Sequence, residues 1–172
     1  MITVRRYLLS GKKHWRFILN HAGLWLALFA GFVGSASEQT LRLPVFRDKP
    51  NNEAFTSQGR TVFLDKPFQL KEFAVEHYAN GTPRHFFADI IVDEQVIRLE
   101  VNHPYSAGWG EDYYLTSYDM HSPEPAYCVV QIVREPLKYV MLAGIIMMLV
   151  GGFLLFLEGP KRSDASSAEK QN

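Results

Sequence analysis

Two uninterrupted apolar stretches lie towards the ends of the chain and divide it into three parts. Residues 139–157 contain no charged residue over 19 positions, and residues 22–34 contain none over 13. A helix needs about 20 apolar residues to cross the hydrocarbon core of a bilayer. The second stretch has that length, and the first reaches it if its helix begins near Trp15. The pattern therefore predicts transmembrane helices over residues 15–36 and 137–158.

Between the two stretches, apolar and polar residues alternate as they do in strands that have one buried face. The alternation runs through residues 86–92, 96–101 and 127–133, and residues 113–118 form a further candidate strand. No amphipathic helical pattern interrupts this region. Five or six short antiparallel strands are expected within residues 61–136, which predicts a small all-β domain, either a sandwich or an open barrel.

Irregularities in this alternation predict where the β domain bends and turns. The parity of apolar positions slips after Leu70, which indicates a β-bulge. The Asn80-Gly81 pair predicts a tight hairpin turn with positive φ at both residues. Asp93-Glu94 predicts a second turn. The segment before the first of these strands, residues 37–60, is rich in turn-forming residues and is expected to be an irregular connector.

The distribution of charge predicts how the chain is oriented in a membrane. Five Lys or Arg residues and no acidic residue precede the first apolar stretch. Cytoplasmic flanks of transmembrane helices are enriched in Lys and Arg. We therefore expect a multi-pass protein of the cytoplasmic (inner) membrane. Its basic N-terminus (residues 1–14) and a disordered polar tail (residues 159–172) would lie in the cytoplasm, and residues 37–136 on the extracytoplasmic, periplasmic side.

A cleavable signal peptide is the alternative interpretation of the first apolar stretch. Such peptides also begin with a basic segment, continue with an apolar core and end in small residues, here Gly34 and Ala36. Trp15 and the apolar residues that follow it lengthen the stretch to about 22 residues, which favours a retained transmembrane helix. The sequence leaves both interpretations open.

Composition and motifs exclude several classes of function. The 18 basic and 18 acidic residues cancel, so no overall field attracts nucleic acid. The single Cys128 excludes an intrachain disulfide, a thiolate zinc cluster and a CxxC redox motif. The histidines show no HxH or HxxxH spacing, and the chain has neither a nucleophile elbow nor a phosphate-binding loop. An enzyme is therefore not expected.

His21 is the first candidate for chemistry, because it lies within the first predicted helix. Ionisable residues inside membrane spans are costly and usually functional, and a neutral imidazole can ligate a metal ion or heme iron. His21 follows Trp15 by six residues, which places it only about 9 Å into the helix. It can therefore also be an interfacial side chain that forms hydrogen bonds beside Asn20, and both interpretations stay open.

The segment 102–118 is dense in glycine, proline and aromatic residues. One interpretation is purely structural, namely a turn that leads into an aromatic strand. The other is a recognition surface for a partner or a flat cofactor, formed by Tyr105, Trp109, Tyr113 and Tyr114.

Small residues recur on one face of the second predicted helix. Ala143, Gly144, Gly151 and Gly152 are spaced by seven to eight residues, and small residues allow a partner helix to approach closely. Glycine is also common in transmembrane helices in general, so the pattern does not by itself establish a docking face.

Three motifs together resemble the ResB (CcsB) family of cytochrome c biogenesis proteins. They are Val101-Asn102-His103-Pro104 with Tyr114 and Ser117-Tyr118, similar to an Asn-x-Pro…Tyr-x-x-Ser-Tyr segment; Val133-Arg134-Glu135-Pro136, similar to an Arg-Asp-Pro element before the last helix; and Asn20-His21 near the start of the first helix. The chain departs from the family pattern in having two spans, a smaller exported domain, Leu115 in place of a polar residue and Glu135 in place of Asp.

The resemblance implies a membrane protein of the pathway that attaches heme to apocytochrome c outside the cytoplasmic membrane. It implies a polytopic CcsA (ResC)-type partner, apocytochrome c as a second partner, and heme as a transient cofactor handled by His21. The surface expected to recognise partners combines residues from the two motif regions and from the second helix: Asn102, Pro104, Trp109, Tyr114, Tyr118, Gly144 and Gly151.

Two hypotheses of function follow from the sequence. The first is an accessory subunit of cytochrome c maturation that assists heme delivery to apocytochrome c together with the CcsA-type partner. The second is a membrane-anchored extracytoplasmic β module, such as a sensor or an envelope-assembly partner, with no role in handling heme.

Overall fold

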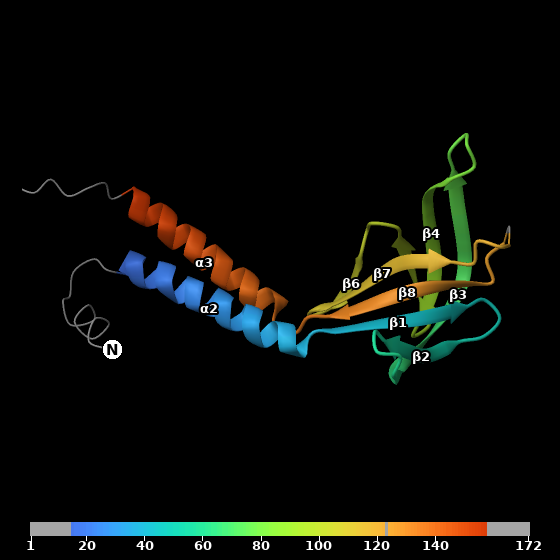
Figure 1. Ribbon diagram of the computed structural model, residues 1–172, viewed down its shortest axis with the longest axis horizontal. Helices are drawn as coiled ribbons and strands as arrows, with labels where there is room; N and C mark the ends of the chain where they lie inside the picture. Colours follow the sequence, from blue (N-terminus) through green and yellow to red (C-terminus); the bar gives the residue numbers. More distant parts are fainter. Residues whose placement is uncertain (1–14, 123, 158–172) are drawn as a thin grey trace, which may run out of the picture. The chain divides into compact units, whose positions relative to one another are not determined.

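A computed structural model describes residues 15–122 and 124–157, which form two helices and eight strands (Figure 1). The helices are α2 (Trp15–Ser37) and α3 (Lys138–Phe156). The strands, in chain order, are β1 (Gln39–Phe46), β2 (Asn51–Thr56), β3 (Thr61–His77), β4 (Pro83–Val92), β5 (Gln95–Glu100), β6 (Tyr105–Gly108), β7 (Glu111–Tyr118) and β8 (Tyr127–Arg134). The chain divides into two compact units, one built on the helices and one spanning Val33–Lys138.

Both helices have the length and composition of membrane spans, so the two predicted helical spans are confirmed. α2 has 23 residues and a mean hydropathy of 1.6, and α3 has 19 residues and a mean hydropathy of 2.4. Their observed bounds agree with the predicted spans to within about two residues where the structure describes them. The predicted cytoplasmic segments, residues 1–14 and 159–172, lie outside the described residues.

The eight strands form one antiparallel sheet with the order β5-β4-β3-β2-β1-β8-β7-β6. Nearly every strand therefore pairs with its neighbour in sequence, and β8 returns to pair with β1 from Gln39↔Arg134 to Phe46↔Tyr127. β5 and β6 are the two outer strands, so the sheet is an up-and-down meander that does not close into a full barrel. This confirms the predicted antiparallel, open all-β domain, with eight strands rather than five or six.

The core of the β domain lies on the concave side of this curved sheet. Aromatic rings meet across it, and the rings of Phe68 (β3) and Tyr113 (β7) pack edge to face with centroids 5.3 Å apart. Cys128 on β8 is fully buried, and burial raises the pKa of its thiol to about 12. The buried apolar cluster includes Leu41, Leu43, Val45, Ala54, Leu64, Leu70, Ala88, Ile90, Leu99, Leu115, Val130 and Ile132.

The predicted irregular connector over residues 37–60 is wrong, because β1 and β2 occupy most of it. Leu41, Leu43 and Val45 alternate with exposed or half-buried residues and point into the core. Pro44 argued against a strand at this position, because proline lacks the N–H that a central strand uses to pair with its neighbours. It is accommodated because the β1–β2 pairing is confined to the start of β1, and the Asn51 side-chain amide donates to the Pro44 carbonyl over 2.8 Å.

The bulge predicted after Leu70 is confirmed, and one of the two predicted turns has a different form. The register of β3 on β4 shifts between Leu70 and Glu72. Asp93 and Glu94 join β4 to β5 with φ values of 53° and 65°, the paired positive φ that had been predicted for Asn80-Gly81. Between β3 and β4 only Gly81 has positive φ, at 81°.

The turn between β3 and β4 is therefore a longer loop than the predicted two-residue turn. Tyr78 donates its N–H to the carbonyl of Thr82, and Gly81 donates to the carbonyl of Tyr78, each over 2.9 Å. Three residues thus lie between Tyr78 and Thr82, and the glycine takes the left-handed position that closes such a loop. The hairpin itself is confirmed.

Candidate functional site

The two helices pack closely through glycines. A methyl group added at Gly23 would lie 2.7 Å from the Gly144 carbonyl oxygen, and one added at Gly144 would lie 2.6 Å from the backbone nitrogen of Ala27. At Gly151 the corresponding contact is 2.5 Å from the backbone nitrogen of Asn20. These distances are shorter than real side chains tolerate, so α2 and α3 approach at backbone contact, as small residues permit between membrane helices.

Two polar side chains of α2 reach across to carbonyl groups of α3. The Asn20 amide donates to the Met148 carbonyl over 2.8 Å, and the Arg16 guanidinium donates to the Leu154 carbonyl over 3.2 Å. Such bonds stabilise a helix pair in lipid, where an unsatisfied polar group is costly. α2 is therefore built into a helical hairpin with α3, which favours the retained helix over the cleavable signal peptide.

This packing gives the small residues of α3 a different neighbour from the one expected. Gly144 and Gly151 are buried, and both lie against α2 of the same chain. Recognition of a polytopic partner by these two glycines stays a prediction. The face that they line is already covered within the chain, so a partner helix would have to contact another face of the hairpin.

The opposite face of α2 carries His21. Helical residues advance by about 100° each, so Asn20, Gly23 and Ala27 fall within about 60° of one another on the side of α3. His21, Trp25 and Phe32 cluster on the side turned away from α3 by the same geometry. Trp25 is 72% exposed and Phe32 82% exposed within the described structure. We call this histidine and aromatic surface, with Phe29 beside it, the outer face of α2.

The imidazole of His21 is held in one orientation on this face. Its Nδ1 lies 2.9 Å from the carbonyl oxygen of Phe17, and its ring packs on the Phe17 ring with centroids 3.8 Å apart. A carbonyl can only accept a hydrogen bond, so Nδ1 carries the proton in the neutral ring. Nε2 then carries the lone pair, which is the arrangement of a histidine that ligates a metal or heme iron.

A second group of interactions joins the β6–β7 turn to the segment that leads into α3. Gly110 has a φ of 68°, and its carbonyl accepts a hydrogen bond from the Glu135 N–H over 2.6 Å. A methyl group added at Gly110 would lie 2.9 Å from the Glu135 carbonyl carbon and closer still to its oxygen. The indole Nε1 of Trp109 donates to the Pro136 carbonyl over 3.1 Å. We call these contacts the α3 clamp.

Ion pairs reinforce the α3 clamp from β7. Arg134 Nε donates to Glu111 over 2.6 Å, and the Tyr113 hydroxyl donates to the other oxygen of the same carboxylate over 2.8 Å. Burial, together with the hydrogen bond to Glu111, raises the pKa of Tyr113. Asp112 is only 5% exposed and forms an ion pair with Lys138, the first residue of α3. The Arg-Glu-Pro element thus belongs to a group of hydrogen bonds and ion pairs that extends from β7 to Lys138.

The remaining residues predicted for partner recognition do not form one surface. Trp109 precedes β7, whereas Tyr118 ends it and packs between Phe73 and Phe86, with ring centroids 4.9 and 5.0 Å away. Tyr118 therefore belongs to the margin of the core. The others are scattered around the β domain: Asn102 has positive φ after β5, Pro104 is exposed, and Tyr114 is half-buried on β7.

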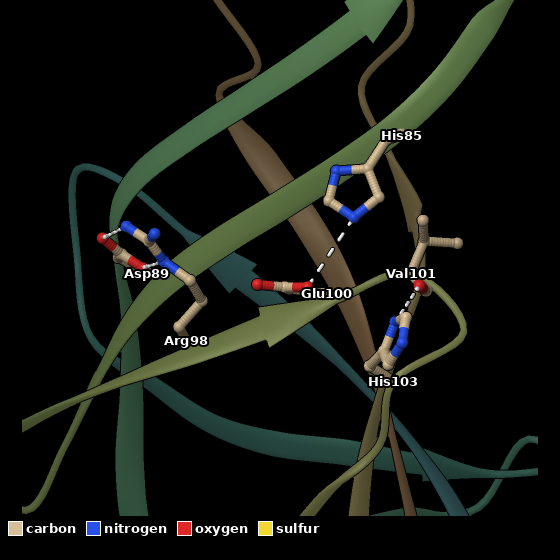
Figure 2. Close-up of polar contacts among 6 residues, drawn as sticks. All are labelled: His85, Asp89, Arg98, Glu100, Val101 and His103. Atoms are coloured by element: carbon tan, nitrogen blue, oxygen red, sulfur yellow. Dashed lines mark hydrogen bonds and ion pairs between the residues drawn. The ribbon is translucent and has the colours of Figure 1, made fainter.

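Histidines of the β domain also form local contacts, which Figure 2 shows on β4, β5 and the residues after β5. His85 Nε2 lies 3.7 Å from Glu100, and His103 Nδ1 lies 3.3 Å from the Val101 carbonyl oxygen. Beside them Arg98 binds Asp89 with both ends of its guanidinium. Within residues 15–122 and 124–157, no three His, Cys, Asp or Glu side chains are grouped as a metal site.

Comparison with known proteins identifies the family. A family model described as the ResB-like family matches residues 11–126, which is 116 of the 172 residues. The chain belongs to the ResB-like family. This confirms the resemblance to the ResB group of cytochrome c biogenesis proteins, and with the two span-length helices it makes the chain a membrane protein. No curated protein matches the sequence.

The fold of this ResB-like protein is also found in a solved structure named Cytochrome c Heme Lyase CcmF. The two chains are 13% identical and superpose with a TM-score of 0.50 over 90% of this chain. This chain spans only 28% of the length of the lyase. The similarity therefore concerns the fold of a helical hairpin with a β domain.

Sequence reasoning identified His21 and the Arg-Glu-Pro element, but not the contacts that give them their positions. The α3 clamp joins residues 23 to 27 positions apart in the chain, and no local pattern indicates such pairings. The glycine at position 23 was also missed, although its spacing from Ala27 and Ala30 could have indicated a small-residue face on the first helix.

Proposed function

We propose that this ResB-like protein is a non-enzymatic membrane subunit of cytochrome c maturation. It assists heme delivery to apocytochrome c together with a polytopic partner of the CcsA (ResC) type. Membership of the ResB-like family supports the role in cytochrome c biogenesis. The likeness in fold to a protein named as a heme lyase is consistent with it.

The observation that carries the proposal is the placement of His21. An imidazole on the outer face of α2 would meet lipid if the chain acted alone, and a polar ring in hydrocarbon is costly. A partner that covers this face removes the cost. The hydrogen bond from Nδ1 to the Phe17 carbonyl directs the ligating lone pair to Nε2, and Trp25 and Phe29 offer stacked aromatic rings nearby, with centroids 6.2 Å apart. A planar heme fits such a surface.

The orientation of the chain determines which step His21 would serve. The excess of basic residues ahead of the first apolar stretch, five against no acidic residue, supports a cytoplasmic N-terminus. The β domain would then lie on the periplasmic side of the inner membrane. His21, near the start of α2, would lie close to the cytoplasmic surface and act in heme uptake rather than in attachment to apocytochrome c.

The non-enzymatic character rests on the state of the reactive groups in the described residues. Burial raises the pKa of Cys128 to about 12, so its thiol is a poor nucleophile at neutral pH. Glu111 and Asp112 are the adjacent carboxylates that an acid–base mechanism would use. Both are held in ion pairs, with Arg134 and with Lys138.

The test is the His21→Ala variant, with His103→Ala as the matched control. His103 is also an exposed histidine whose Nδ1 contacts a nearby backbone carbonyl, but it lies in the β domain. The full chain is expressed with its partner, and three quantities are measured: heme per purified complex, mature cytochrome c, and the amount of this protein. We expect His21→Ala to lower the first two without lowering the third, and added imidazole to restore them partly.

The control should leave all three quantities unchanged. Normal maturation of cytochrome c in the His21→Ala variant would instead favour an interfacial role for His21. The chain would then be a membrane-anchored β module without a function in heme handling.

A further inference from the structure

Trp109 is a large apolar side chain that the β domain holds outward. It is 71% exposed, while its only polar atom, Nε1, donates to the Pro136 carbonyl over 3.1 Å. The neighbouring Gly110 is fixed by its hydrogen bond with Glu135. The indole is therefore held at this turn by its polar edge, while most of its surface stays exposed.

The indole of Trp109 is bound close to the start of α3. Its acceptor, Pro136, lies two residues before Lys138, the first residue of α3, and Lys138 is itself bound to Asp112 on β7. Trp109 is thus bound to the short segment through which the chain enters α3. The ends of a membrane-spanning helix lie in the polar headgroup region, where Trp is enriched because one edge of its ring is polar and the rest apolar.

The β2–β3 turn lines a pocket together with the residue that follows α2. Gln58 and Arg60 of this turn line a pocket of about 390 Å³ together with Glu38, the first residue after α2. Arg60 is exposed and is held by a hydrogen bond from its guanidinium to Gln58 over 2.8 Å. A guanidinium binds phosphate oxygens well, so both points where the chain meets its helices carry a residue suited to the lipid headgroup region.

We infer that the β6–β7 turn is a membrane-interface anchor, with Trp109 inserted among the lipid headgroups of the leaflet on the β-domain side. Its partner is the lipid surface and not a protein. The α3 clamp holds Trp109 in place within the β domain. Insertion of Trp109 therefore limits the distance between the β domain and the bilayer. The inference is independent of any function in heme handling.

Depth-dependent quenching of tryptophan fluorescence tests this inference in the full-length protein reconstituted in lipid nanodiscs. The chain has three tryptophans, so the W15F/W25F variant leaves Trp109 as the only emitter. The matched control carries Met120→Trp with all three tryptophans replaced by Phe. Met120 is 72% exposed and follows β7 at its far end, opposite to the β6–β7 turn. The quenchers are phosphatidylcholine brominated on its acyl chains and aqueous iodide.

We expect Trp109 to lose most of its emission in brominated lipid, more with bromine near the headgroup than near the chain end, and little in iodide. The tryptophan at position 120 should show the reverse. Strong quenching of Trp109 by iodide overturns the inference, and so does quenching by neither reagent, which would place the indole against protein. A second comparison needs a single substitution. The emission that bromolipid quenches should be larger in the native chain than in Trp109→Phe, and the difference gives the quenching of Trp109.

Discussion

The α3 clamp allows a quantitative prediction at Gly110. Two features of this position oppose any side chain: its φ of 68°, and the backbone of Glu135 and Pro136 within contact distance of an added methyl group. Gly110→Ala is therefore expected to destabilise the β domain through both features at once.

The two contributions can be separated with a glycine that has only the first feature. Gly81 has a φ of 81° and nothing within 4 Å of an added methyl group. Placing alanine in the left-handed region costs about 1–2 kcal/mol, which is the whole effect expected for Gly81→Ala. Forcing a methyl group into a closely packed site costs about 1–3 kcal/mol more. Gly110→Ala should therefore lower the free energy of unfolding by about 2–5 kcal/mol.

Cys128 provides the assay, because it is the only cysteine and is fully buried on β8. Its thiol should react with a maleimide only when the sheet opens, so the labelled fraction against urea concentration follows unfolding of the β domain in the full chain. With a urea dependence of about 1–3 kcal/mol per molar, the midpoint for Gly110→Ala should fall clearly below that for Gly81→Ala. Equal midpoints for the two variants would refute the close contact between the β6–β7 turn and the Glu135–Pro136 backbone.

Three further predictions concern the helices, the orientation and the buried thiol. Gly144→Leu should separate α2 from α3 and abolish disulfide crosslinking between cysteines placed on the two helices, whereas Gly31→Leu, with only the Met141 sulfur 3.8 Å away, should not. Protease added to spheroplasts should cut within residues 38–138 and spare tags at both ends, and loss of the N-terminal tag from mature protein would support the signal peptide. Raising the pH from 8 to 10 should destabilise the β domain in the native chain more than in Cys128→Ala, as measured by urea unfolding followed by far-ultraviolet circular dichroism. The unfolded thiol ionises above a pKa of about 8.5, whereas the folded thiol of Cys128 stays protonated up to about 12; an equal loss in both would contradict the burial argument.

The fold was largely predictable because its main signals are local. Long stretches without a charged residue indicate the two spans. The alternation of apolar and polar residues indicates strands such as β4, β5 and β8. β1 was missed because its role depends on a distant strand. Its pairing with β8 joins residues 39–46 to residues 127–134, and Pro44 together with polar neighbours gives the segment the composition of a loop.

The candidate site was less predictable, since it depends on which helix face meets which neighbour. The glycines of α3 indicated close packing but not the identity of the packed helix, which is α2. The position of His21 in a span was visible in the sequence. Its placement opposite Gly23 and Asn20, and thus away from α3, required the helix pair to be known.

The most direct test of the proposed function is the spectrum of heme bound to the purified complex. If Nε2 of His21 would hold the heme iron, replacing it by a ligand of another kind should change the electronic structure of the iron. His21→Met should shift the visible absorption bands and the electron paramagnetic resonance signals of the copurified heme, while Phe17→Leu, which removes only the ring packed on His21, should preserve the ligand type. Spectra from His21→Met that are identical to those of the native complex, with the same heme content, would contradict ligation by His21.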